Sequence, residues 1–161
     1  MIIWLTGQPG SGKSTLAKSI IDKLTKKESS KKIINIDGDD LRDISSNKDY
    51  SKEGRIKNIS TAISIARFLS NKKYTVIISI VAPYRFLRDE LKGQFAFLEV
   101  YLHTKEIRGR EGYFAKDYEI PIDNKALFLD TGKLNIEECT NEILNVYRKM
   151  ATLAQRSSLA D

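Results

Sequence analysis

The chain contains few of the residues that mark several common protein classes. Its 161 residues include one cysteine, one histidine, three prolines and nine glycines. The single cysteine, Cys139, cannot form a disulfide within the chain or build a cysteine-rich zinc site, which excludes a disulfide-stapled miniprotein. The low proline and glycine content excludes collagen-like and low-complexity architectures. This cysteine usage agrees with a reducing compartment.

Long apolar runs are also lacking. The apolar stretch at residues 1–5 has no basic region before it and ends at Thr6, so it is too short for a signal peptide. No segment approaches the roughly 20 apolar residues that a membrane helix needs. The sequence therefore predicts a cytoplasmic protein without a membrane partner.

What the chain does contain is typical of one globular domain. Hydrophobic residues make up 41% and charged residues 30%, and 27 basic against 21 acidic residues give a net charge of +6. This balance favours anionic partners. The basic residues around positions 26–32 are mixed with acids, as on a solvated face, so no nucleic-acid partner is expected. We predict a single domain over residues 1–154 and a flexible tail at 155–161.

Short apolar runs alternate with longer amphipathic segments, which indicates an α/β domain with a parallel sheet. The third of the expected helices begins with Pro83 in its first turn. The expected strands span residues 2–6, 33–37, 75–81, 95–103 and 126–130, and the expected helices span 13–27, 51–70, 83–92 and 135–150.

Residues 7–14 match the pattern G-x-x-x-x-G-K-[ST] at every fixed position, between an expected strand and an expected helix. Such glycines let the backbone fold around a phosphate, and the helix N-terminus adds positive potential. In this motif Lys13 reaches the β- and γ-phosphates and the Ser14 hydroxyl ligates Mg²⁺. ATP and Mg²⁺ are therefore the expected cofactors, in a three-layer P-loop NTPase fold with a parallel five-stranded sheet. The expected nucleotide-binding residues of this P-loop are Gly7, Gln8, Pro9, Gly10, Ser11, Gly12, Lys13, Ser14 and Thr15.

Three carboxylates follow the second expected strand, at the sheet edge where α/β proteins bind ligands. The third strand carries no acid at its tip, so we assign the metal or general-base role to Asp37 and positioning of the acceptor to Asp39. The alternative is that these acids only cap a helix beginning near Asp40, and for Asp40 itself capping is the favoured interpretation.

Several arginines are spaced for binding anions, although each is also compatible with a solvated surface charge. Arg55 and Asn58 share one helix face at i, i+3 spacing. His103 is assigned a structural role. The other arginines in question are Arg42, Arg85, Arg108 and Arg110.

From residue 2 to about residue 143 the chain resembles the adenylylsulfate kinases of the P-loop kinase fold. The resemblance rests on the P-loop and on the segments at 37–42, 55–59, 82–85, 99–101, 129–131 and 136–139. It implies an alcohol-group phosphotransferase that uses ATP to phosphorylate the ribose 3′-hydroxyl of adenosine 5′-phosphosulfate, a small-molecule nucleotide acceptor. It also implies a homodimer as one expected assembly.

The resemblance implies roles for individual residues. Lys13, Asp37 and Asp39 would be catalytic, with Asp37 and Ser14 on the metal. Arg108 would contact the ATP base from a lid, beside Thr131. The acceptor would be held by Asp39, Arg42, Tyr50, Arg55, Asn58, Pro83, Tyr84 and Arg85.

Departures from the family pattern leave the acceptor open. Ala82 replaces a serine that many members carry, and Tyr50 stands for the family's phenylalanine in Gly-Phe-Ser. A segment before Asp117 is missing, including the phenylalanine that stacks on the acceptor's adenine. Because stacking is worth about 1–3 kcal/mol per base, its loss weakens adenine selection. Cytidine 5′-diphosphoramidate, the acceptor of a relative in bacterial capsule synthesis, is the alternative.

Residues 105–116, called here the lid segment, are expected to close over the cleft and exclude water, with Gly109 and Gly112 as hinges. The sequence argues against two rival functions. A regulatory NTPase switch would need a guanine-reading Asn-Lys-x-Asp segment, which residues 123–126 only approach. A nucleic-acid-binding protein would need clustered rather than scattered basic residues.

Overall fold

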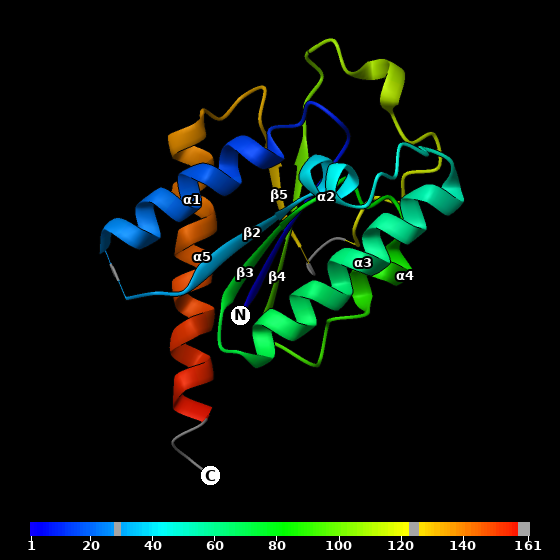
Figure 1. The fold of residues 1–161 in the computed structure, drawn as a ribbon. Helices are drawn as coiled ribbons and strands as arrows, with labels where there is room; N and C mark the ends of the chain where they lie inside the picture. The colour runs from blue at the N-terminus through cyan, green and yellow to red at the C-terminus, as the bar shows by residue number, and fades with distance from the viewer. Residues whose placement is uncertain (28–29, 123–125, 158–161) are drawn as a thin grey trace.

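The computed structural model describes residues 1–27, 30–122 and 126–157, and its central element is a parallel β-sheet. Within the described residues, the strands form one five-stranded sheet in the order β2-β3-β1-β4-β5, with every neighbouring pair parallel (Figure 1). This confirms the predicted α/β class and sheet. The strands are β1 (Ile2–Thr6), β2 (Ile33–Asp37), β3 (Thr75–Ser79), β4 (Phe97–His103) and β5 (Leu127–Asp130).

Helices cover both faces of this sheet, which gives the three layers expected (Figure 1). Alternate residues of β1 point to opposite cores: Trp4 packs against α3 and α4, and Leu5 packs against α1 and α5. Of the described helices, none is long and apolar enough to cross a membrane. The helices are α1 (Lys13–Lys27), α2 (Gly38–Ile44), α3 (Lys52–Asn71), α4 (Arg85–Asp89), α5 (Ile136–Ser157) and a 3₁₀ turn, η1 (Glu111–Tyr113).

Some boundaries differ from those expected, for local reasons. Strand β3 ends at Ser79, which pairs with Asp37, the last residue of β2, and with Leu5 of β1. Helix α4 begins at Arg85 with Tyr84 as N-cap, so the placement of Pro83 in its first turn is wrong. Helix α5 continues to Ser157, through residues 155–157 of the expected tail; residues 158–161 lie outside the described residues.

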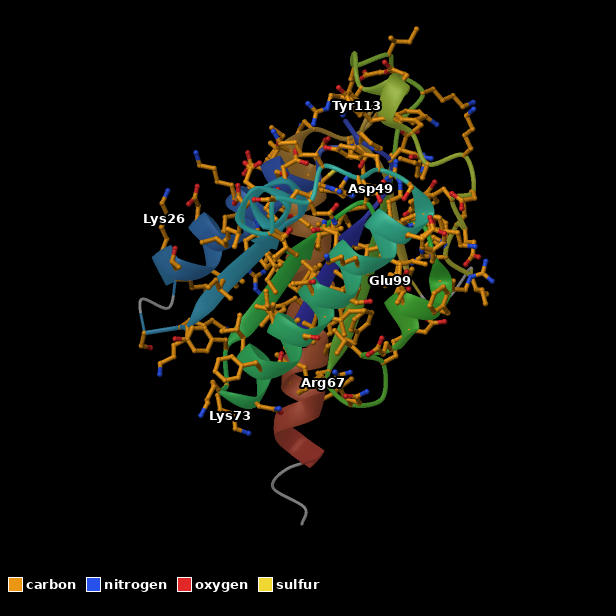
Figure 2. The ribbon with its side chains drawn as sticks, turned by 45° about the vertical axis from the view of Figure 1, so that its right-hand side comes forward. Lys26, Asp49, Arg67, Lys73, Glu99 and Tyr113 are labelled. Atoms are coloured by element: carbon orange, nitrogen blue, oxygen red, sulfur yellow. The ribbon has the colours of Figure 1, made fainter. Side chains whose placement is uncertain are left out.

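A buried ion pair holds the loop after β3 in place behind the sheet edge. Arg88 is completely buried, and its Nε donates to Glu99 Oε1 at 2.7 Å. Its two other nitrogens donate to the carbonyls of Ala82 and Glu119. Lys92 Nζ lies 2.6 Å from Glu99 Oε2, so both carboxylate oxygens are paired. Figure 2 shows Glu99 on the side of the sheet that α3 covers. The network therefore holds the backbone at Ala82 and Glu119 in place.

Candidate active site

An open cleft of about 770 Å³ lies at the carboxyl edge of the sheet. Figure 2 places Tyr113 and Asp49 at this end of the molecule and Lys73 at the other. Parallel α/β sheets bind ligands at this edge. The lining comes from the P-loop, α2, α3, the end of β3 and the lid segment: Pro9, Gly10, Gly12, Lys13, Ser14, Thr15, Asp37, Gly38, Asp39, Arg42, Asp43, Asn47, Lys48, Tyr50, Arg55, Asn58, Ile59, Ser79, Ile80, Val81, Arg108, Arg110 and Tyr113.

The P-loop is wrapped closely against the sheet and around the Lys13 side chain. A Cβ at Gly7 would collide with the carbonyl oxygen of Leu102 on β4, so this approach requires glycine. Lys13 is buried, and its Nζ donates to the carbonyls of Gly7 at 3.0 Å and Gln8 at 2.8 Å. These carbonyls hold the ammonium group at the position from which the motif's lysine reaches phosphates.

Burial lowers the pKa of Lys13 to about 7, although Asp37 and Asp39 favour its charged form and Arg110 disfavours it. The free protein at pH 8 therefore holds Lys13 mostly neutral, whereas a triphosphate stabilises the cation. We expect binding of a nonhydrolysable MgATP analogue at pH 8 to take up close to one proton. Titration calorimetry in buffers of different ionisation enthalpy measures this number, and binding without proton uptake would contradict the lowered pKa.

Asp37 caps helix α2 and also lines the cleft. Its side chain caps α2 by accepting from the backbone N–H of Asp39 at 2.9 Å. Its other oxygen, Oδ2, accepts from the hydroxyls of Ser14 at 2.6 Å and Ser79 at 2.9 Å. Helix α2 begins at Gly38, so the assignment of the cap to Asp40 is wrong: Asp40 lies in the first turn, and Asp37 is the cap.

The pair formed by Ser14 Oγ and Asp37 Oδ2 fits a magnesium ion. Both are hard oxygen donors, and they face one cleft beside the P-loop. Mg²⁺ is commonly held by one or two protein oxygens together with substrate phosphates and water. Ser79 was missed by the sequence analysis; the signal was its place at the tip of the strand beside Asp37.

Asp39 lies across the cleft mouth from the lid segment. Its carboxylate is exposed and its Oδ2 is 3.4 Å from the guanidinium of Arg110. An exposed pair of this kind contributes little to stability, so this carboxylate can exchange Arg110 for a ligand.

Arg42 and Arg55 place two buried guanidiniums side by side without a carboxylate pair among the described residues. Arg42 donates to the carbonyls of Asn47 and Asp49 at 3.0 and 2.7 Å. Arg55 donates to the carbonyls of Tyr50 and Tyr113, both at 3.0 Å. Burial lowers the pKa of Arg42 and the neighbouring Arg55 lowers it further, whereas Tyr50 and the more distant carboxylates of Asp39 and Asp49 act in the opposite direction. Two clustered cations at the cleft wall have the charge and geometry suited to holding an anion.

Asn58, buried beside these arginines, donates from Nδ2 to the carbonyl of Gly38 at 3.3 Å. Its Oδ1 is buried and has no partner among the described residues. A buried acceptor of this kind is normally satisfied by a ligand or water.

Two tyrosines stand beside the arginine pair. The ring centroids of Tyr50 and Tyr113 are 5.6 Å apart, and the Arg42 guanidinium lies 4.2 Å from the centroid of Tyr50. Tyr113 was not among the expected site residues. Its place in the lid segment was the available signal, but its contact with a residue 63 positions earlier depends on the tertiary fold.

Arg108 and Thr131 pack against the P-loop. Arg108 donates to the carbonyls of Gly10 at 3.0 Å and Thr131 at 2.7 Å. The Thr131 hydroxyl donates to the carbonyl of Ser11 at 3.1 Å. The structure thus brings both residues to the nucleotide loop.

Three expected acceptor residues do not reach the cleft. Pro83 and Tyr84 are buried, Tyr84 within the core beneath α3 and α4. The backbone N–H of Arg85 donates to Glu119 Oε2, and the Arg85 guanidinium donates to the carbonyl of Ile120. None of the three is among the cleft-lining residues, so this geometry does not support their contact with the acceptor.

Comparison with known proteins agrees with this geometry. Residues 1–120 match the family model described as adenylylsulphate kinase. The chain is 34% identical over 128 residues to the cytidine diphosphoramidate kinase of Campylobacter jejuni, covering 76% of this chain and 74% of that one. It is 36% identical over 166 residues to the adenylyl-sulfate kinase of Bacillus velezensis, covering 89% and 83%.

Among solved structures, the fold is similar to that of the Mycobacterium tuberculosis APS kinase in complex with AMPPNP and APS. The TM-score is 0.76 at 23% identity, and the match covers 91% of this chain and 96% of that one. The family match spans the P-loop, the Asp37 strand end, the arginine pair and the whole lid segment. The chain therefore belongs to the adenylylsulphate kinase family, as a phosphotransferase of the P-loop kinase fold with a hydroxyl acceptor.

Proposed function

We propose that the chain transfers the γ-phosphoryl group of ATP to the ribose 3′-hydroxyl of a nucleotide with an anionic 5′ group. The observation that carries this proposal is the buried pair Arg42 and Arg55, which has no carboxylate partner among the described residues. The pair shares one cleft with the P-loop and Asp37. An anionic acceptor held there presents its sugar to Asp37.

In the proposed reaction the 3′-oxygen forms a bond to the γ-phosphorus as the bond from that phosphorus to the bridging oxygen of ADP breaks. Asp37 orients the hydroxyl and accepts its proton. Lys13 and the loop amides offset charge on the transferring group, where positioning and electrostatics supply most of the catalysis. Mg²⁺, held by Ser14 and Asp37 with the phosphates, would neutralise charge on the phosphate oxygens. The lid segment limits transfer to water.

The acceptor proposed first is adenosine 5′-phosphosulfate, because several similar proteins, among them those of Bacteroides thetaiotaomicron and Bacillus velezensis, are adenylyl-sulfate kinases. Cytidine 5′-diphosphoramidate is the second candidate, and a specific observation favours it. The segment before Asp117 that carries the family's adenine-stacking phenylalanine is missing from this chain, which weakens selection for adenine. The cytidine diphosphoramidate kinase of C. jejuni is also 34% identical to this chain.

A direct test incubates the protein with MgATP and each of adenosine 5′-phosphosulfate, cytidine 5′-diphosphoramidate, ADP and CDP. Mass spectrometry identifies the phosphorylated nucleotide, and NMR identifies the position. We expect one of the first two to gain a phosphate at the 3′-oxygen, with the plain diphosphates as poorer acceptors. ATP hydrolysis without a phosphorylated nucleotide, or phosphate at another position, would refute the proposal. The homodimer and the cytoplasmic location remain predictions.

A further inference from the structure

The side chain of Gln8 joins the P-loop to the lid segment. Its Nε2 donates to the carbonyl of Ala115 at 2.8 Å, and its Oε1 accepts from the N–H of the same residue at 2.9 Å. The carboxamide therefore pairs with one residue's backbone through both of its polar groups, across 107 positions of the sequence. Ala115 is buried, so neither hydrogen bond is readily exchanged for one to bulk water.

The same residue is linked to the phosphate-binding lysine. The backbone carbonyl of Gln8 accepts from Lys13 Nζ at 2.8 Å. A phosphate that draws the ammonium group away removes this hydrogen bond from Gln8. Gln8 is flanked by Gly7 and Pro9 in a closely packed loop. Loss of the hydrogen bond from Lys13 therefore affects the Gln8 backbone, and with it the position of the Gln8 carboxamide.

The other end of the paired lid backbone lies at the acceptor site. Two residues before Ala115, the carbonyl of Tyr113 accepts from Arg55 at 3.0 Å, and the Tyr113 ring contacts Tyr50. Residues 113–115 thus connect the arginine pair to the P-loop over a very short stretch of chain. Two other lid residues contact the rest of the site: Arg108 donates to the carbonyl of Gly10 at 3.0 Å, and Arg110 lies 3.4 Å from Asp39 in an exposed ion pair.

We propose that Gln8 is a positioning residue that fixes residues 113–115 over the acceptor subsite and couples triphosphate binding to acceptor binding. The inference rests on the proposed function for the identity of that subsite, but the hydrogen-bonded pair is independent of it. Coupling of this kind is reciprocal: each ligand changes the affinity for the other by the same factor.

The first experiment measures hydrogen exchange in the lid segment of the full chain, with and without AMPPNP and Mg²⁺. Gln8→Leu keeps the approximate size of the side chain and removes both hydrogen bonds. We expect residues 113–115 to exchange at least about tenfold faster in this variant, as for the loss of two hydrogen bonds. Gln94→Leu, at an exposed glutamine bonded to Glu90, is the matched control. Unchanged exchange in Gln8→Leu would overturn the proposal, and this readout needs no acceptor.

The second experiment measures steady-state kinetics with whichever of adenosine 5′-phosphosulfate and cytidine 5′-diphosphoramidate the wild type phosphorylates. In Gln8→Leu we expect KM for the acceptor at saturating ATP and KM for ATP at saturating acceptor to rise by a similar factor, about tenfold, and ATP hydrolysis to rise relative to transfer. The dissociation constant of AMPPNP without acceptor, measured by titration calorimetry, should change much less. Gln8→Glu keeps a hydrogen-bond acceptor for the Ala115 N–H and should fall between the wild type and Gln8→Leu. A merely structural role would weaken AMPPNP binding without acceptor to the same extent, and that outcome refutes the coupling. If the wild type phosphorylates neither nucleotide, the proposed function fails while the exchange experiment still decides the role of Gln8.

Discussion

Asp37→Asn is expected to lower kcat for phosphoryl transfer by about 10²–10⁴-fold, the usual contribution of a positioned general base. The amide cannot take the proton of the acceptor hydroxyl, and it is a weaker partner for a metal beside Ser14. Asparagine caps helices as well as aspartate does, so the bond from the Asp39 N–H and the start of α2 should survive. The substitution thus separates the charge of Asp37 from its capping role. Steady-state assays at saturating ATP and acceptor measure the loss.

Asp40→Asn is the matched control for this experiment. Asp40 is an exposed acid in the first turn of the same helix and does not line the cleft. We expect its kcat to stay within about twofold of the wild type, because surface substitutions of this kind change little. If Asp37→Asn also kept wild-type turnover, Asp37 would have no part in the chemistry. Circular dichroism of both variants checks that α2 remains folded.

The second large effect is expected for Arg55→Met, which removes one cation of the buried pair and keeps an unbranched apolar stem. A hydrogen bond to a charged group is worth about 1.5–3 kcal/mol, which corresponds to roughly 10–150-fold in kcat/KM for the acceptor. KM for ATP should change little, because Arg55 lies on α3, away from the P-loop contacts of Lys13 and Arg108. Initial rates at varied acceptor and at varied ATP separate the two effects.

Arg67→Met supplies the comparison on the same helix. Arg67 forms an exposed ion pair with Glu90 at 3.0 Å, a type of contact worth about 0–1 kcal/mol. Arg67→Met should leave kcat/KM for the acceptor and KM for ATP unchanged. Arg55 also supports the carbonyls of Tyr50 and Tyr113, so the melting temperature of each variant is measured alongside. Equal losses in kcat/KM for ATP and for the acceptor would argue against an anion site at Arg55.

Local patterns predicted most of the sheet and the nucleotide loop. The first two strands and α1 have the expected bounds, because each is a short apolar run or an amphipathic segment next to a glycine-rich turn. The P-loop could be recognised for the same reason, since its fixed residues are contiguous in sequence. Asp37 could be assigned to the sheet edge because it is the last residue of a strand.

Contacts between distant segments could not be predicted in this way. The Ser79 hydroxyl reaches Asp37 through the register of β2 and β3, which the sequence does not state. Tyr113 meets Tyr50, and Gln8 meets Ala115, only because the lid segment folds back over the cleft. Arg85 shows the converse: the family resemblance placed it at the acceptor, and packing turns its guanidinium to the carbonyl of Ile120.

The sequence by itself determined that this protein is an α/β domain with a phosphate-binding loop before α1 and an acid at the tip of β2, because those features depend on residues close together in the chain. Only the tertiary structure decided which cations remain without a carboxylate partner among the described residues, and which aromatic rings face them. Arg42 and Arg55 resemble other arginines in sequence. Their burial beside one cleft, with backbone carbonyls as their hydrogen-bond acceptors among the described residues, is a property of the packed molecule. Charge pairing and burial depend on distances that folding sets.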